Sequence, residues 1–329
     1  MTNARHRDVA LPGEALQGHA PGAGLPAYVL MTPARNEMQF IEETIKSVVA
    51  QTVLPLKWAI VSDGSTDGTD EIVSRYAAQH TWIELVRMPE RTERHFAGKA
   101  LAVHAGASRM QGLSYEVIAS LDADITFDPQ YFEFLLGKIA ADAGLGVVGA
   151  AYLDSTNETY DYRFVSTDHV SGACQVFRRA CWEEIGGYVQ SKGGCIDSIA
   201  TLTARSKGWK TRTFAEKMAL HHRVIGTAQN GAIQARFVLG KRDWMIGNSA
   251  LWELCRGLYQ MTKKPYLLRG MAILTGYVWA ACTGVERPVP AELRAFRRRE
   301  QMGFLRRFLM RRTGTDAREV RSESTQAAG

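Results

Sequence analysis

Short apolar runs alternate with amphipathic stretches from residue 27 onward. Five runs have the length and the β-branched content of strands: 27–33, 56–63, 83–88, 115–122 and 145–153. Four stretches between them have helical periodicity: 37–51, 67–79, 97–110 and 129–141. This alternation predicts an α/β fold, Rossmann-like in outline, with a mostly parallel sheet that is flanked by helices.

The alternation becomes less regular after residue 153. Residues 172–188 have the pattern of a strand, a turn and a short helix that ends at Gly186 and Gly187. Residues 195–209 have the periodicity of an amphipathic helix with Asp197 in its first turn. Beyond His222, apolar runs alternate with Arg and Lys, which predicts a helical C-terminal extension of the surface-seeking kind.

Composition suggests four parts. Residues 1–26 are rich in Gly, Ala and Pro and lack the apolar segment of a signal peptide, so we expect a disordered leader. Residues 27–225 form the predicted α/β domain, 226–313 the helical, basic region, and 314–329 a disordered tail. The longest uncharged stretch, 270–285, is shorter than the roughly 20 apolar residues of a membrane span, and indicates a core or interfacial helix.

The net charge of +6 is concentrated late in the chain, in the Arg-rich residues 294–312. Such a block favours an anionic partner, either a lipid headgroup surface or nucleic acid. No recognised nucleic-acid module accompanies it, so we predict a membrane surface and no nucleic acid. The five cysteines are odd in number and form no CxxC pair, which favours a reducing compartment. We therefore expect a cytoplasmic protein on the inner face of the cell membrane.

Polar residues gather where three of the predicted strands end. The first strand ends in TPARNE, the second in SDGSTDGT and the fourth in DAD. In parallel sheets, ligands bind beyond the carboxyl ends of the strands. The three segments therefore indicate one shared site at this edge of the sheet.

Asp122 and Asp124 flank the small residue Ala123 at the end of the fourth predicted strand. On an extended strand the two carboxylates would point to opposite faces, so they can act together only if the strand has ended. Mg²⁺ and Mn²⁺ take oxygen ligands, and a bound diphosphate could complete the coordination of such an ion. The alternative is an ordinary solvated turn, which we favour for Asp128 as a helix N-cap.

Taken in order, six motifs resemble the family 2 inverting glycosyltransferases: PARNE, SDGSTDGT, GKALAVHAG, LDAD, SGACQVFRRACWEEIGGY and IDSIATLTARSKGW. The resemblance covers about residues 27–223. It implies the glycosyltransferase A-type fold, a nucleotide-diphosphate sugar donor and a divalent metal, Mg²⁺ or Mn²⁺. UDP is the default nucleotide by this resemblance, with GDP and dTDP open.

The resemblance also implies roles for individual residues of the donor site. The nucleotide pocket would be lined by Pro33, Arg35, Asn36 and Glu37, with Asp63 on the base or ribose and Lys99 as a cation near the nucleotide. Asp122 would face the ribose and the metal, and Asp124 would bind the metal directly. A-type enzymes often add a later His ligand, for which we choose His222 over His221, a structural His being the alternative.

The Glu-Asp pair of the family corresponds to Ile196-Asp197 in this chain, so the Asp matches and the Glu does not. The resemblance makes Asp197 the general base that removes a proton from the acceptor hydroxyl. A positioned base of this kind contributes about 10²–10⁴ in rate.

Residues 236–281 resemble, more loosely, the C-terminal region of a bacterial subgroup linked to surface or exopolysaccharide assembly. The QxxRW signature of processive synthases is absent, which predicts one sugar per encounter with a glycan or lipid-linked acceptor. Two alternatives remain: a sugar nucleotidyltransferase, whose Gly-rich pattern is missing here, and a non-catalytic nucleotide- or carbohydrate-binding protein.

Overall fold

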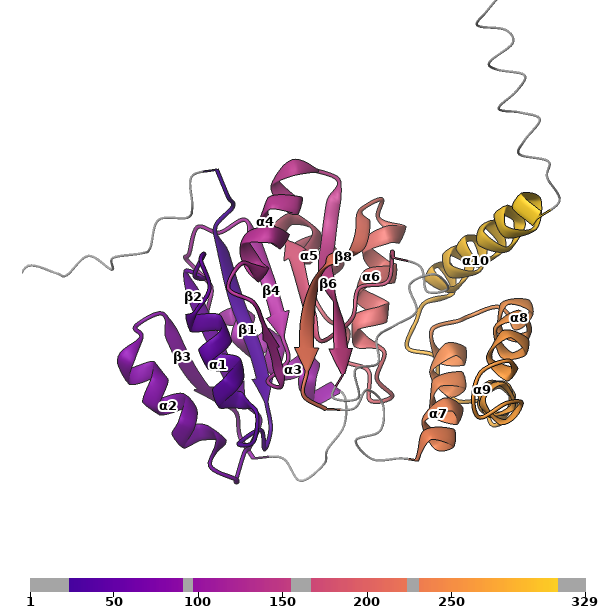
Figure 1. Ribbon diagram of the computed structural model, residues 1–329, viewed down its shortest axis with the longest axis horizontal. Helices are drawn as coiled ribbons and strands as arrows, with labels where there is room; N and C mark the ends of the chain where they lie inside the picture. The colour runs from indigo at the N-terminus through magenta and orange to yellow at the C-terminus, as the bar shows by residue number, and fades with distance from the viewer. Residues whose placement is uncertain (1–23, 91–96, 155–166, 224–230, 313–329) are drawn as a thin grey trace, which may run out of the picture.

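The computed structural model describes residues 24–90, 97–154, 167–223 and 231–312. Most of the predicted leader (residues 1–23) and all of the predicted tail therefore lie outside the described residues. The described chain forms an α/β region followed by four helices (Figure 1).

Eight strands in the described part of the chain form one sheet, in the order β3-β2-β1-β4-β7-β6-β8-β5. Their bounds are β1 Tyr28–Ala34, β2 Lys57–Ser62, β3 Ile83–Arg87, β4 Val117–Leu121, β5 Ile125–Phe127, β6 Leu145–Asp154, β7 Cys174–Arg178 and β8 Lys210–His221. The pairs β1–β2, β1–β4, β2–β3 and β6–β8 are parallel, whereas β7 runs antiparallel to β4 and β6, and β5 to β8. The predicted mostly parallel α/β sheet is thus confirmed, with three antiparallel pairs added.

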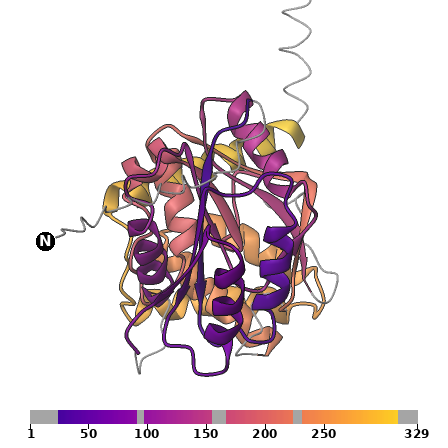
Figure 2. The same ribbon diagram turned by 90° about the vertical axis from the view of Figure 1, so that its left-hand side faces the viewer.

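Helices cover both faces of the sheet (Figure 2). Their bounds are α1 Ile41–Val49, α2 Thr69–Gln79, α3 Ala97–Ser108, α4 Tyr131–Ala141, α5 Arg179–Ile185 and α6 Ile196–Ser206. Period-two alternation in β1 separates two cores: Tyr28 and Leu30 pack with α1, α2 and α4, while Val29 and Met31 pack with α3, α5 and α6. All four of these β1 side chains are buried.

The predicted helical extension consists of α7 Ala232–Met245, α8 Ala250–Met261, α9 Leu268–Cys282 and α10 Ala291–Arg312. It joins the α/β region through a small core in which Ile199 and Leu202 of α6 meet Val289 and Leu293. Arg205 of α6 strengthens this junction by donating to Glu300 of α10 at 2.7 Å. Among the described residues, no helix has the length and apolarity to cross a membrane.

Candidate active site

The carboxyl ends of β2, β1 and β4 lie side by side, because β1 pairs in parallel with both of the others. The three polar segments therefore meet at one edge of the sheet, as the sequence predicts. β4 ends at Leu121, and the chain turns at residues 123–124. The hydroxyl of Thr44 donates to the carbonyl oxygen of Ala123 at 2.8 Å and so anchors this turn to α1.

Lys99, from α3, connects the turn to the segment that precedes β7. Its Nζ lies 2.5 Å from Oδ1 of Asp122 and donates to the carbonyl oxygen of Gly172 at 3.1 Å. The backbone N–H of Gly172 in turn donates to Oδ2 of Asp197 at 3.2 Å. A Cβ on Gly172 would lie 2.9 Å from the Cβ of Asp197, so this close approach requires glycine. The structure thus links Asp122, Lys99 and Asp197 in one continuous set of contacts.

The positive charge of Lys99 offsets only part of the charge of the neighbouring carboxylates. Burial acts to lower the pKa of Lys99, but the neighbouring Asp122 outweighs it and holds that pKa above its ordinary value. Burial, with the adjacent carboxylate of Asp124, raises the pKa of Asp122 against the opposing effect of Lys99. Two carboxylates that disfavour each other's charge create a place where a further cation would be stabilised.

Asp124 is buried and faces two basic side chains. Its Oδ2 lies 3.4 Å from Nε2 of His221 and 3.7 Å from Nε of Arg223. Burial acts to raise the pKa of Asp124, but the hydrogen bond from His221 outweighs it and holds that pKa below its ordinary value. Arg223 also forms an ion pair with Glu37, with Nη2 and Oε2 2.5 Å apart. Burial raises the pKa of Glu37 to about 7 although Arg223 opposes the shift.

His222, which we chose as the later metal ligand, is directed elsewhere. Its Nε2 lies 3.0 Å from the hydroxyl of Thr126, and its ring stacks on Phe40 with centroids 5.8 Å apart. His221 lies beside Asp124 instead. Successive side chains at the end of an extended strand point to opposite faces, which separates the two imidazoles.

The remaining predicted donor residues lie where β1 and β2 end. Pro33 pairs with Val61 in the sheet, and Nη1 of Arg35 lies 3.7 Å from Oδ2 of Asp63. Asn36 has a positive φ of 56°, and its side-chain oxygen accepts from the backbone N–H of Thr66 at 2.9 Å. This group is joined to Asp124 through the neighbouring Glu37–Arg223 ion pair.

The side chains that could serve as metal ligands here suit a hard divalent cation. Within the described residues, no group of three or more His, Cys, Asp and Glu side chains is arranged to hold a metal. Mg²⁺ sites in nucleotide-dependent enzymes, however, often use one or two carboxylates and draw their other ligands from substrate phosphates and water. The two carboxylates of Asp122 and Asp124 correspond to that smaller set, and His221 lies beside Asp124.

Two parts of the site were missed at the level of sequence: Arg223 and the backbone of Gly172. Arg223 closes the LHHR segment, and Gly172 opens the motif that leads into β7. Both depend on pairing between segments far apart in the chain. The only signal in the sequence was for Arg223, a cationic side chain directly after the two histidines.

Comparison with known proteins agrees with this architecture. The family model described as Glycosyl transferase family 2 matches residues 29–192. The probable glycosyltransferase YdaM of Bacillus subtilis (strain 168) is 25% identical over 214 residues, covering 58% of this chain and 49% of YdaM. The chain spans less than half the length of such curated relatives, from 12% to 49% of each.

Two solved structures share the fold. A mannosyltransferase from Pyrobaculum calidifontis, in complex with GDP-Man and Mn²⁺, has a TM-score of 0.54 at 20% identity, covering 84% of this chain and 80% of that one. Residues 1–349 of S. aureus TarS, in complex with UDP-GlcNAc, have a TM-score of 0.51 at 12% identity, with coverages of 82% and 78%. The sheet is that of the A-type glycosyltransferases, and through residues 29–192 the chain belongs to glycosyl transferase family 2.

Proposed function

We propose that this protein is an inverting glycosyltransferase that moves one sugar from a nucleotide-diphosphate donor to a hydroxyl of a glycan or lipid-linked acceptor. The observation that carries the proposal is the double contact of Lys99. One ammonium group touches both Asp122, on the donor side, and the carbonyl of Gly172, whose N–H holds Asp197. These contacts support a single site that contains both the residues proposed to bind the donor and the proposed base.

In this mechanism the end of β1 and Asp63 bind the nucleoside, while Lys99 faces the diphosphate. Asp124 and Asp122 would hold the divalent metal, with His221 beside Asp124. When bound, a metal in this position neutralises the charge that develops on the departing diphosphate. Lys99 adds a second positive charge on the same side of the site.

Asp197 would act on the acceptor. The N–H of Gly172 holds its Oδ2, which orients the carboxylate and leaves Oδ1 to take the proton from the acceptor hydroxyl. As this proton is removed, the acceptor oxygen forms a bond to the anomeric carbon, and the bond from that carbon to the diphosphate oxygen breaks on the opposite side. The anomeric configuration is therefore inverted.

UDP-sugar is the preferred donor in this proposal, since the family resemblance favours it and one neighbour of the same fold binds UDP-GlcNAc. The GDP-Man complex of the other neighbour makes GDP-sugars the second group to test. We place the reaction in the cytoplasm, at the anionic inner face of the cell membrane, because the C-terminal region is strongly basic.

A donor screen tests the proposal. UDP-, GDP- and dTDP-sugars are incubated with the protein, with Mn²⁺ or with EDTA, and release of nucleoside diphosphate is measured. We expect release of nucleoside diphosphate from the sugars of one nucleotide class, with Mn²⁺ and not with EDTA. A parallel assay supplies sugar 1-phosphate and nucleoside triphosphate. Pyrophosphate release there, with no release of nucleoside diphosphate from any donor, would identify a nucleotidyltransferase and overturn the proposal.

A further inference from the structure

Helix α8 directs its leucines outward. Leu251, Leu254 and Leu258 are 54%, 48% and 54% exposed, and their spacing places them on one face of the helix. Glu253, on the opposite face, is only 1% exposed. This is the reverse of the pattern in an ordinary soluble helix, where the apolar face is buried and the charged face is solvated.

The interior around Glu253 is polar. Asn248, which is buried, donates to Oδ1 of Asp243 at 3.1 Å and to Oε1 of Glu253 at 2.8 Å. Arg297 of α10 donates to the side-chain oxygen of Asn248 at 3.1 Å, and Arg256 forms an ion pair with Asp243. Hydrogen-bonded polar groups thus occupy positions that leucines would fill in an ordinary helical core.

Helix α9 has the same outward bias. Leu268, Met271, Val278 and Trp279 are exposed, and no charged residue lies between Gly270 and Cys282. Its inner side contains Gly270, Ala272, Gly276 and Ala280 together with Ile273 and Tyr277. A Cβ on Gly276 would lie 2.0 Å from the carbonyl oxygen of Phe237 in α7, so the two backbones are in direct contact.

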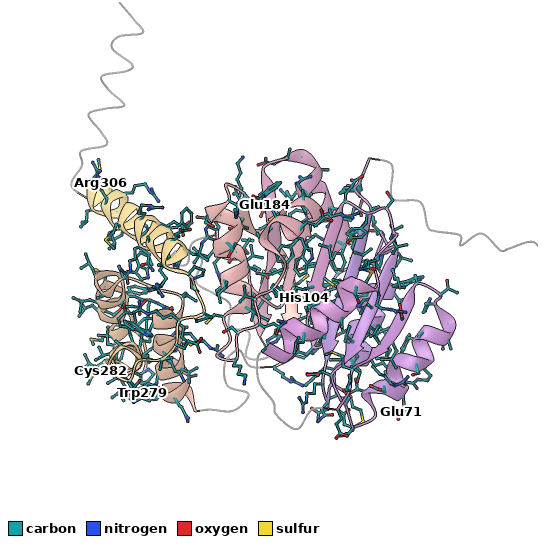
Figure 3. All side chains as sticks on the ribbon, turned by 180° about the vertical axis from the view of Figure 1, so that it is seen from behind. Glu71, His104, Glu184, Trp279, Cys282 and Arg306 are labelled. Atoms are coloured by element: carbon teal, nitrogen blue, oxygen red, sulfur yellow. The ribbon has the colours of Figure 1, made fainter. Side chains whose placement is uncertain are left out.

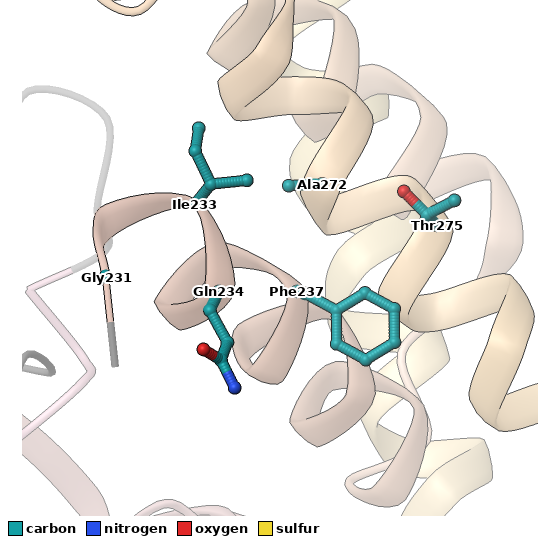
Figure 4. Close-up of a pocket in the computed structure, with 6 residues that line it drawn as sticks. All are labelled: Gly231, Ile233, Gln234, Phe237, Ala272 and Thr275. Carbon is teal, nitrogen blue, oxygen red and sulfur yellow. The ribbon is translucent and has the colours of Figure 1, made fainter. Parts of the chain in front are cut away.

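Together these residues form what we call the apolar face: Leu251, Leu254, Leu258, Leu268, Met271, Val278 and Trp279. Figure 3 shows Trp279 at the lower edge of the helical region. An open, mostly apolar pocket of about 660 Å³ between α7 and α9, which Phe237, Ala272 and Thr275 help to line, extends this uncharged surface (Figure 4).

Basic residues border the apolar face. Nζ of Lys241 lies 5.6 Å from the ring centroid of Trp279, and Nζ of Lys263 lies 5.1 Å from that of Tyr259. Residues 231–312 contain 16 Lys and Arg against 5 Asp and Glu, a net charge of +11. Apolar and aromatic side chains with a basic border are typical of helices that lie in the plane of a membrane interface.

We propose that the apolar face docks onto an anionic lipid bilayer, with α8 and α9 lying in the headgroup region. The inference rests on the membrane location in the proposed function and deepens it by naming the contacting surface. Charge decides against a second copy of the chain as the occupant, because a symmetric dimer through this face would bring two regions of +11 together. Anionic headgroups supply the complementary charge.

The test is flotation of the full chain with vesicles of phosphatidylcholine, with and without phosphatidylglycerol. We expect binding to the anionic vesicles at low salt. Leu254→Glu with Leu258→Glu should weaken binding about tenfold or more, because burial of even one of the two leucine side chains contributes about that factor. Val189→Glu is the control for a carboxylate added at an exposed apolar position, since Val189 is 40% exposed but lies between α5 and α6, and it should bind as the wild type does.

A second readout uses the exposed Cys255, on α8. With Cys282→Ser as background, an environment-sensitive fluorophore on Cys255 should shift its emission to the blue when anionic vesicles are added. No vesicle binding by the wild type would overturn the proposal. So would leucine variants that bind normally while Arg306→Glu with Arg307→Glu does not, because α10 would then be the contact.

Concentration-dependent dimers that the leucine variants dissolve, without vesicle binding, would assign the face to a second copy and also overturn the proposal. None of these measurements requires turnover. Failure here is therefore distinguishable from failure of the proposed activity, which the donor screen reports.

Discussion

Lys99 and Asp122 form an ion pair 2.5 Å long between α3 and the turn that follows β4. The same ammonium group reaches the backbone of Gly172, and through it the carboxylate of Asp197. One side chain therefore connects the two halves of the proposed reaction, the departure of the diphosphate and the deprotonation of the acceptor.

Replacement of Lys99 by Met retains the aliphatic side chain and removes its charge. We expect the free energy of unfolding to fall by about 1–3 kcal/mol, because Asp122 then lies beside Asp124 without its counter-charge. Mn²⁺ should restore more stability to this variant than to the wild type, since a bound ion replaces the missing charge. Thermal unfolding with and without Mn²⁺ measures both effects, with the exposed Lys46→Met as control. Equal increases in Tm for the wild type and Lys99→Met would contradict this account.

The two adjacent histidines provide a matched pair of variants. His221 lies beside Asp124, whereas His222 faces Thr126. His221→Ala should weaken Mn²⁺-dependent nucleotide binding about tenfold or more, since an imidazole in this position either binds the metal or orients its carboxylate ligand. His222→Ala should leave that binding close to the wild-type value. Calorimetric titration of the nucleotide in Mn²⁺ measures both affinities. A larger loss for His222→Ala than for His221→Ala would restore His222 as the metal ligand.

The strands that could be predicted clearly from the sequence are those formed by unbroken apolar runs. β1, β2 and β4 are short, buried and flanked by helices with clear periodicity, so both they and the polar residues at their ends could be located. β8 was missed because its pairing with β6 shifts register between Ala150 and Ala151, where the partner changes from Phe214 to Met218. The residues between these partners bulge, which breaks the period-two alternation of a strand.

The failure to predict β8 also explains why His222 was chosen over His221 from the sequence. Without β8, nothing in the sequence says which face His221 and His222 occupy, so a choice between them had no physical basis. The links of Lys99 and Asp197 through Gly172 were invisible for a different reason: they use backbone groups, which every residue carries.

The close packing of α7 on α9 predicts a strong effect of one added methyl group. Gly276→Ala should lower the free energy of unfolding by about 1–3 kcal/mol or more, because the new Cβ would lie 2.0 Å from the carbonyl oxygen of Phe237 and would force the helices apart. Gly303→Ala in α10 is the control, since its Cβ would meet no atom closer than 3.5 Å. This control should stabilise slightly, as alanine favours helix over glycine. Chemical denaturation compares the two, and equal stabilities would show that the backbones are not in contact.

Glu253 makes stability depend on pH. Burial, with the nearby carboxylate of Asp243, raises the pKa of Glu253 from 4.5 to about 7. The folded protein therefore binds this proton more tightly than the unfolded chain, and the stabilisation that is fully present below pH 4.5 is lost as the pH rises to about 7. The loss is on the order of 3 kcal/mol.

Glu253→Gln keeps the oxygen that accepts from Asn248 and removes the titration. The difference in unfolding free energy between this variant and the wild type should grow from pH 5 to about pH 8, whereas exposed Glu292→Gln should follow the wild type. Parallel pH profiles for the wild type and Glu253→Gln would exclude this titration as the cause.

The most direct test of the central claim separates chemistry from binding at Asp197. With the donor class found by the screen, turnover and donor affinity are measured for the wild type, for Asp197→Asn and for the distant control Asp142→Asn, whose side chain pairs with Lys210. The account predicts that Asp197→Asn lowers turnover by about 10²–10⁴ while donor affinity stays close to the wild-type value. Turnover equal to that of the wild type would contradict it.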